Sequence, residues 1–238
     1  MNYKIPSAFI IGILKFFILI LLPMPTAHAQ LTLIEHIQED TQSIVTVQAQ
    51  KLPPNVTLNN TNIPFLEQSG AGIIIDPAGY IVTNTHIILY ADFIYVTLSS
   101  GTRLPAAIVA IAPQSDFTIL KINSPTPLKP LPWSESSQIT LNQDVISIGN
   151  SALWKKTICA GKITGLAKSL STDNTGLIEM NLDLDRGDSG GPILDRQGNF
   201  LGIIMAKNTR VERSSYALPA WDIREFFLKH LKESPNSP

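Results

Sequence analysis

The sequence contains a single cysteine, Cys159, in 238 residues, so no disulfide can form within the chain. The fold therefore has to be stabilised by a hydrophobic core rather than by covalent cross-links. The sequence also lacks a Cys-x-x-Cys pair, and its four histidines are scattered, which argues against a dedicated zinc site. We predict that the protein uses neither a metal nor another cofactor.

The sequence has no excess of charge of either sign, because 18 basic side chains stand against 19 acidic ones and the net charge is −1. A protein that binds nucleic acid or coats an anionic membrane gains its affinity from positive charge. Neither kind of partner is therefore expected. The mean hydropathy of +0.15 is high for a soluble protein, but the apolar excess lies at the N-terminal end.

Residues 1–29 have the composition of a secretory signal peptide. Lys4 and Lys15 supply positive charge, residues 16–22 are purely apolar, and "AHA" at 27–29 places small residues where a signal peptidase reads them. A retained membrane anchor is the alternative. Against it, Lys15 interrupts the apolar stretch, and the remainder is shorter than the roughly 20 residues of a span. We predict cleavage and export to the periplasm or the medium, without stable membrane insertion afterwards.

Short runs of β-branched and aromatic residues, separated by turns, fill most of the remaining chain. The first set comprises "SIVTVQAQ", "GAGIII", "GYIVT", "FIYVTL", "AAIVAI" and "FTILKI", and the second "DVISIG", "KKTICAGKITGL", "GLIEMNLDL", "GPILD" and "FLGIIMA". Between the sets lies "NSPTPLKPLPW", whose prolines favour a stiff strap rather than a strand. This pattern predicts an all-β fold of two six-stranded antiparallel β-barrels.

The same pattern gives the domain boundaries. We predict a signal peptide over residues 1–29, an N-terminal β-barrel over 30–124, an interdomain strap over 125–134, a C-terminal β-barrel over 135–220, and a C-terminal helix and tail over 221–238. In that helix we expect one face to pack on the body of the protein, formed by Trp221, Phe227, Leu228 and Leu231.

Smaller features are predicted by local composition. The segments 76–79 and 195–198 each begin with aspartate and end with glycine, which is typical of a tight hairpin turn. Residues 51–69 are rich in Pro, Asn and Thr, so we expect a long exposed loop there. Residues 31–40 could form a short amphipathic helix.

The segment "DLDRGDSGGPIL" at residues 183–194 points to a nucleophile. Gly190 and Gly191 leave bare backbone beside Ser189, which would permit close approach of a substrate. The backbone N–H groups of Gly187 and Ser189 could converge as an oxyanion hole, where each donor is typically worth about 2.7–4 kcal/mol of transition-state stabilisation. A plain surface turn is the alternative for this segment.

A serine hydroxyl needs a base that accepts its proton, and that base needs an acid that orients it. His28 would leave with the signal peptide, and His36 and His230 lie in predicted terminal helices, so His86 in "YIVTNTHIIL" is the remaining histidine. We expect His86 where a strand runs into a loop. Activity should then fall on acidification, because the base must be neutral to accept a proton.

For the orienting acid, Asp116 in "PQSDFTILKI" begins a strand late in the first set. Asp76, Asp92 and Asp144 are alternatives, although Asp76 is already assigned to its turn. Taken singly, His86 and Asp116 could each be ordinary structural residues.

Several segments together resemble a known family. "GDSGGP" is similar to the nucleophile motif of chymotrypsin-like, trypsin-like serine proteases, and the order His, Asp, Ser matches theirs. "SGAGIIIDPAGYIVTNTHII", "SDFTILKI" and "ISIGNSALWKKTICAGKITGL" resemble segments of the HtrA/DegP family of exported serine proteases. The resemblance covers roughly residues 31–220.

The resemblance implies a chymotrypsin-like double barrel with a catalytic triad in its cleft. His86 would be the general base, Asp116 would orient it, Ser189 would attack, and Gly187 with Ser189 would bind the oxyanion. Protein or peptide substrates are implied, in quality control or processing of exported proteins. The oligomeric state is not predicted.

The sequence departs from the family at two points. Asp188 stands where HtrA proteins usually carry asparagine, and the chain ends soon after Trp221, so we expect no PDZ domain.

Asp183, six residues before Ser189, resembles the base of the primary pocket in trypsin-like enzymes, where aspartate favours Arg or Lys before the scissile bond. A solvent-facing aspartate is the alternative, since HtrA relatives generally prefer small aliphatic residues.

Two other functions compete with the endopeptidase. One is a non-catalytic or conditionally inactive binding or chaperone module on the protease fold. Against it, sequence drift after a loss of activity would tend to replace one of the triad residues, and all three are present. The other is an esterase of the α/β-hydrolase class, which is excluded by residue order because there the histidine follows the serine.

Overall fold

The structure is a computed structural model that describes residues 41–53, 66–134, 139–151, 155–167, 176–185, 187–207 and 213–233. The predicted signal peptide and the predicted helix at residues 31–40 lie outside these ranges. No helix in the described ranges combines the length and the apolar character needed to cross a membrane.

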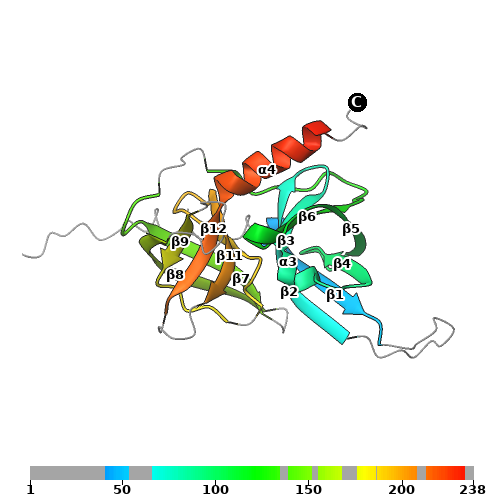
Figure 1. The fold of residues 1–238 in the computed structure, drawn as a ribbon, viewed down its shortest axis with the longest axis horizontal. Coiled ribbons are helices and arrows are strands. Elements are labelled where there is room, and N and C mark those ends of the chain that lie inside the picture. The colour runs from blue at the N-terminus through cyan, green and yellow to red at the C-terminus, as the bar shows by residue number, and fades with distance from the viewer. Residues whose placement is uncertain are drawn as a thin grey trace, which may run out of the picture. The chain divides into compact units, whose positions relative to one another are not determined.

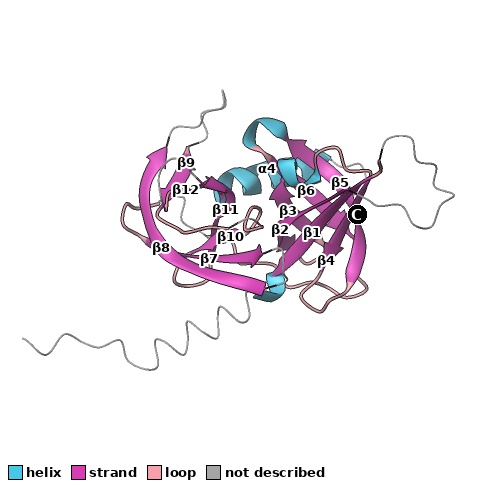
Figure 2. Ribbon diagram, turned by 90° about the horizontal axis from the view of Figure 1, so that it is seen from below, coloured by secondary structure: helices cyan, strands magenta, loops and turns pink. Residues whose placement is uncertain are grey.

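The described residues form two closed six-stranded antiparallel barrels and a C-terminal helix, which confirms the predicted fold class (Figures 1 and 2). In the first barrel the strands are β1 (Ile44–Lys51), β2 (Leu66–Asp76), β3 (Tyr80–Asn84), β4 (Phe93–Thr97), β5 (Arg103–Ala112) and β6 (Phe117–Ile122). In the second they are β7 (Asp144–Ser151), β8 (Lys155–Ala167), β9 (Leu177–Met180), β10 (Pro192–Leu194), β11 (Phe200–Lys207) and β12 (Ser215–Pro219). The helices are η2 (Thr41–Ser43), α3 (Thr85–Ile88), η3 (Pro113–Ser115) and α4 (Ala220–Glu233).

Each barrel encloses its own apolar core, because alternate residues of a strand point to the same face. In β1, Val45, Val47 and Ala49 are buried and belong to the first core, with Ile74, Ile81 and Leu120 from β2, β3 and β6. The second core gathers a matching set of aliphatic residues from β7 to β12: Val145, Ile163, Ile178, Met180, Leu182, Leu184, Ile193, Leu201, Ile204 and Ala217.

Both predicted hairpin turns are confirmed. Gly79 N–H donates to the Asp76 carbonyl at 3.0 Å, and Gly198 N–H donates to the Asp195 carbonyl at 3.1 Å. Both glycines adopt positive φ angles, of 95° and 81°, which side chains rarely tolerate. Each aspartate carboxylate also accepts the N–H two residues on, at Ala78 (2.7 Å) or Gln197 (2.8 Å), so the aspartates close the turns.

Three local predictions need correction. Residues 66–69, expected in a loop, are the first residues of β2, since they pair in register with the end of β1 (Leu66 with Lys51). β12 was not among the predicted runs, because its five residues end in proline and adjoin the helix, yet it pairs with both β11 and β9. His86 lies in the single helical turn α3 rather than in a loop.

The proline-rich segment holds to both barrels through backbone hydrogen bonds. Leu131 N–H donates to the Ile74 carbonyl of β2 at 3.0 Å, and the Leu131 side chain is buried. Farther along, Phe200 N–H of β11 donates to the Pro132 carbonyl at 2.7 Å, and the Trp133 and Phe200 rings lie 5.3 Å apart. Consecutive residues near the end of the segment therefore attach it to both barrels.

Helix α4 follows the second barrel in sequence but extends over the first (Figure 1), on which it packs aromatic side chains. Phe226 contacts Phe117 of β6 edge to face, with 4.9 Å between ring centroids, and Phe227 contacts Tyr80 of β3 at 5.1 Å. Such pairs add about 0.5–1.5 kcal/mol beyond area burial. The chain thus returns from the second barrel to close over the first.

The packed face of α4 agrees with the predicted one at Phe227 and differs from it at Trp221 and Leu228, while the side chain of Leu231 lies outside the described part of the chain. Its buried side chains are Ala220, Ile223 and Phe227, spaced at three and four residues, as expected for one helical stripe. Leu228 is 46% exposed, and Trp221 is only half-buried. Phe226, which was not in the predicted stripe, also packs on the first barrel, so the packed face is shifted from the predicted one.

A carboxylate in the first turn of α4 makes stability depend on pH. Burial, reinforced by Glu225, raises the pKa of Asp222 to about 6 from the model-peptide value of 3.8. Because the carboxyl pKa is higher in the folded than in the unfolded protein, the fold is favoured most below pH 3.8, where the group is protonated in both states. This contribution to stability is lost as the pH rises through about 6. We expect Asp222→Asn to raise the unfolding free energy near neutral and alkaline pH by about 0.5–1 kcal/mol, a small effect because the side chain is partly exposed and solvent screens its charge. Near pH 4 the exchange should have little effect.

The measurement is denaturant unfolding of both proteins at about pH 8 and pH 4. Glu225→Gln is the matched control on the same helix, and it should give a smaller effect of the same sign. An effect of Asp222→Asn that did not change with pH would contradict the explanation.

Candidate active site

His86 and Asp116 are brought together by the pairing of β3 with β6. These strands are antiparallel, and Asn84 at the end of β3 pairs with Phe117 at the start of β6. The residues just beyond Asn84 therefore lie opposite the residue just before Phe117, and Thr85 N–H donates to the Asp116 carbonyl at 3.1 Å. Sheet register alone places the histidine beside the aspartate.

Both carboxylate oxygens of Asp116 bind the same histidine. The His86 backbone N–H donates to Asp116 Oδ1 at 2.9 Å, and His86 Nδ1 lies 2.7 Å from Asp116 Oδ2. An ionised carboxylate can only accept, so Nδ1 carries the proton and Nε2 of the neutral ring keeps its lone pair. The ring is thus held in the tautomer that accepts a proton at Nε2.

Asp116 itself occupies a constrained backbone position. It follows η3 with φ 50° and ψ 39°, in the left-handed region, where aspartate is among the better tolerated residues with a side chain. Its own N–H donates to the Pro113 carbonyl at 3.4 Å. The turn thereby directs the carboxylate toward His86.

The other candidate acids are engaged elsewhere. Asp76 closes its turn, and Asp92 Oδ2 accepts the Leu52 N–H at 2.7 Å. Asp144 pairs with Lys162 Nζ at 2.5 Å and with Arg196, and the hydrogen bond from Lys162 leads the interactions that lower its pKa. Of the four aspartates considered, Asp116 is the one in contact with His86.

Asn84 was not predicted from sequence and supports the same pair. Its side chain is fully buried, and Nδ2 donates to the Asp116 carbonyl at 3.1 Å and to Met205 Sδ of β11 at 3.2 Å. It therefore links the Asp116 backbone to the second barrel. In the sequence, Asn84 is a polar residue between an apolar strand and the histidine. The sequence alone does not distinguish such a residue from an ordinary helix cap.

Ser189 lies in a turn of the second barrel that touches the first. Its carbonyl accepts the Ala71 N–H of β2 at 2.8 Å. A Cβ added at Gly70 would lie 3.1 Å from the Ser189 carbonyl oxygen and 2.3 Å from Ile87 Cδ1, so Ser189 and the residue after His86 border one glycine. Within the described residues, no hydrogen bond joins the Ser189 hydroxyl to His86.

Among the described residues around Ser189, two backbone N–H groups donate to no acceptor. The N–H groups of Asp188, Gly190 and Gly191 donate to carbonyl oxygens at 3.3, 3.1 and 2.9 Å. Within the described part of the chain, those of Gly187 and Ser189 donate to none. Gly187 has a φ of 100°, a conformation that favours glycine. The two donors that sequence analysis singled out are therefore the uncommitted ones in this turn.

Asp188 is built into the turn rather than exposed on it. Its side chain is 2% exposed, and Oδ2 accepts the Asp185 N–H at 2.7 Å, which ties the start of the turn to its centre. This is the residue at which the sequence departs from the family pattern. The carboxylate supplies the acceptor that the Asp185 amide needs.

Cys159 and Asp183 lie next to each other, because Cys159 Sγ donates to the Asp183 carbonyl at 3.1 Å. Burial, with the carboxylates of Asp188, Asp183 and Asp185, raises the pKa of the Cys159 thiol, which disfavours the reactive thiolate. Cys159 is thus poorly suited as a nucleophile. The Asp183 residue is exposed and accessible to a ligand.

Gly190 is required by close contact between the barrels. Its φ is 83°, and an added Cβ would lie 2.0 Å from the Ala71 carbonyl oxygen and 3.1 Å from Thr83 Oγ1. Gly101, with φ 86°, has nothing within 4 Å of the same position. Gly101→Ala should cost about 1–2 kcal/mol from backbone strain alone, whereas we expect Gly190→Ala to cost about 2 kcal/mol more because backbone must move.

Chemical denaturation of the two variants beside the parent protein measures this difference. Equal losses of unfolding free energy would show that the barrels do not meet at Gly190 as described.

Comparison with known proteins places the chain in a family. The model of the trypsin-like peptidase domain matches residues 70–203, more than half of the chain, and this range includes His86, Asp116 and Ser189. Protease Do-like 1 from the chloroplast of Arabidopsis thaliana is 33% identical over 181 residues, which are 73% of this chain and 41% of that protein. The periplasmic serine endoprotease DegP of Salmonella typhimurium is 33% identical over 137 residues, 56% of this chain and 29% of that protein.

A solved HtrA-type protease with a decapeptide superposes with a TM-score of 0.74 at 22% identity, covering 84% of this chain and 67% of that one. This likeness shows the fold. The chain spans 41% and 29% of the length of these two curated relatives. Because the family model matches more than half of the chain, the chain belongs to the trypsin-like peptidase family, and it is similar to HtrA-type proteases.

Proposed function

We propose that the protein is a serine endopeptidase that cleaves protein substrates with His86, Asp116 and Ser189. The observation that carries the proposal is the double hydrogen bond from His86 to Asp116, at 2.9 and 2.7 Å, because it fixes both the orientation and the tautomer of the base. A histidine that only stabilised the fold would not need its Nε2 left free.

In this proposal the reaction follows the serine-protease sequence. His86 Nε2 accepts the Ser189 hydroxyl proton as the oxygen attacks the scissile carbonyl carbon, and it later donates that proton to the leaving amine. Asp116 remains ionised and stabilises the imidazolium. The uncommitted N–H groups of Gly187 and Ser189 bind the negative oxygen of the tetrahedral intermediate. Water then hydrolyses the acyl-enzyme by the same route.

Asp183 is the proposed substrate-binding residue. Its exposure and its position on the segment that leads to Ser189 support contact with the side chain before the scissile bond. A carboxylate there would favour Arg or Lys at that position over a neutral residue.

We further propose that the protein is exported and acts on periplasmic or secreted proteins, in quality control or processing. The support is the charged and apolar pattern of residues 1–29. The relatives include a protein named as periplasmic and others named as chloroplastic or mitochondrial. A protein that carries the fold as a binding or chaperone module is the competing function, and the test below separates the two.

The test is covalent labelling of the purified chain by a fluorophosphonate probe, which reacts with a serine that a neighbouring base has activated. We expect labelling that is lost in Ser189→Ala. Folded protein that is not labelled, although a control serine protease is, would favour the binding module.

A further inference from the structure

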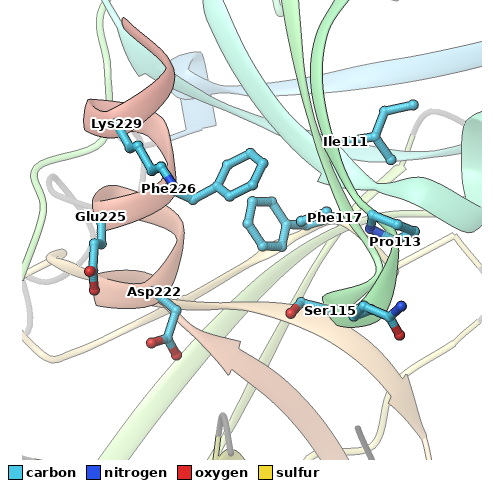
Figure 3. A pocket seen from close by; sticks show the side chains of 10 residues that line it. Ile111, Pro113, Ser115, Phe117, Asp222, Glu225, Phe226 and Lys229 are labelled. Carbon is cyan, nitrogen blue, oxygen red and sulfur yellow. The ribbon is translucent and has the colours of Figure 1, made fainter. Parts of the chain in front are cut away.

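A groove lies on the first barrel between helix α4 and η3, the 3-10 turn that comes just before Asp116 (Figure 3). Its volume is about 380 Å³. One wall is the first turns of α4, and the other is residues 111–115, the end of β5 and η3. None of the three proposed triad residues lines it, although Ser115 and Phe117, on either side of Asp116, do.

The floor of the groove is apolar. Phe117 and Phe226 meet there at 4.9 Å, with Ile111 and Pro113 beside them (Figure 3). Ile111 is 45% exposed. Ile108 and Val109 of the same strand, β5, are also 45% and 44% exposed. Exposed aliphatic side chains near a concave aromatic floor are typical of a surface that binds another polypeptide.

The rim of the groove on α4 is acidic. Asp222 and Glu225 lie on the same side of the helix, three residues apart, with Lys229 one turn farther on (Figure 3). In the described part of the chain, neither carboxylate forms an ion pair or hydrogen bond. Burial and Glu225 raise the pKa of Asp222, so the ionised pair is unfavourable until a cation approaches. The opposite wall offers only the neutral side chains of Gln114 and Ser115.

We propose that this groove is a docking site for a basic segment of a partner polypeptide, with an aliphatic or aromatic side chain over Phe117 and Phe226 and an adjacent Lys or Arg at Asp222 and Glu225. The apolar floor supplies burial, and the rim supplies charge complementarity, which also selects against acidic segments. The site does not depend on the proposed triad, so it would bind in the absence of hydrolysis.

The experiment uses the full chain with Ser189→Ala, so that no peptide can be cleaved, and fluorescence anisotropy of labelled pentapeptides. The probe is Gly-Lys-Leu-Arg-Gly with blocked ends, and the comparison probes are Gly-Glu-Leu-Glu-Gly and Gly-Lys-Ser-Arg-Gly. We expect the first to bind at least about tenfold more tightly than either comparison probe.

Two variants locate the binding. Asp222→Asn combined with Glu225→Gln removes the charge of the rim and should weaken binding of the first probe about tenfold or more. Gln114→Lys, at an exposed position on the opposite wall, adds a positive charge and should weaken it several-fold without disturbing the core. Leu228→Lys is the matched control, because it adds the same charge to an exposed position of α4 outside the groove, and should leave binding nearly unchanged.

Several outcomes would overturn the proposal. One is that the three probes bind alike or not at all, and another is that Gln114→Lys and Leu228→Lys have equal effects, which would indicate nonspecific charge attraction. Self-association of the chain that Gln114→Lys abolishes would assign the groove to a second copy instead. If the first probe bound only after residues 234–238 had been deleted, the groove would be assigned to the chain's own tail.

Discussion

Replacing Ser189 with alanine is expected to lower kcat for peptide hydrolysis by about 10⁴- to 10⁶-fold, because no other group in the site can form the acyl-enzyme. The fold should be retained, since the contact of this residue with the first barrel is made by its carbonyl, which accepts the Ala71 N–H at 2.8 Å in either protein. Cys159 is poorly suited to act in its place, because burial raises the pKa of its thiol and disfavours the thiolate.

The measurement is the rate of cleavage of an unfolded protein substrate, together with the melting temperature of each variant. Ser100→Ala, at an exposed turn, controls for the loss of a hydroxyl elsewhere. Cleavage by pure Ser189→Ala at a rate near that of the parent would refute the assignment of the nucleophile.

Asp116→Asn is expected to lower kcat by about 10⁴-fold, the loss typical of this exchange in serine proteases, while KM changes little. In the parent, two N–H donors of His86 address two carboxylate oxygens. An amide offers only one oxygen. If that oxygen keeps the backbone N–H, the NH₂ group faces Nδ1 and forces the proton onto Nε2, where it blocks acceptance from the serine.

The control for this exchange is Asp144→Asn, which removes a carboxylate paired with Lys162 and Arg196 at a site away from the histidine. It should leave kcat within about twofold of the parent. Steady-state kinetics on one peptide substrate decides the question, and equal losses in both variants would mean that the loss of activity reflects general destabilisation rather than the tautomer of His86.

The barrel architecture could be predicted, and Ser189 and His86 could be selected as the candidate nucleophile and base, because each rests on a local pattern. "GDSGGP" is contiguous, and the alternation of apolar residues marks the strands. The choice of Asp116 among four aspartates could be favoured but not decided, because contact with His86 depends on the register that pairs Asn84 with Phe117. The sequence of one strand does not by itself determine the register in which it pairs with a distant strand.

Features set by tertiary packing were missed for the same reason. The stripe of α4 that is buried depends on where Tyr80 and Phe117 lie, and these belong to another barrel. The role of Asn84 depends on a carbonyl at Asp116 and a sulfur at Met205, both far away in sequence. Strand β12 gains its stability from neighbours on both sides, so five residues suffice.

The return of α4 to the first barrel also has a consequence for biosynthesis. A ribosome releases the chain from its N-terminus, so the first barrel emerges long before Phe226 and Phe227 are available to cover Phe117 and Tyr80. Until then the strands that carry His86 and Asp116 lack part of their packing, and Ser189 has not yet reached Ala71. The proposed site therefore cannot assemble until the C-terminal part of the chain has been made.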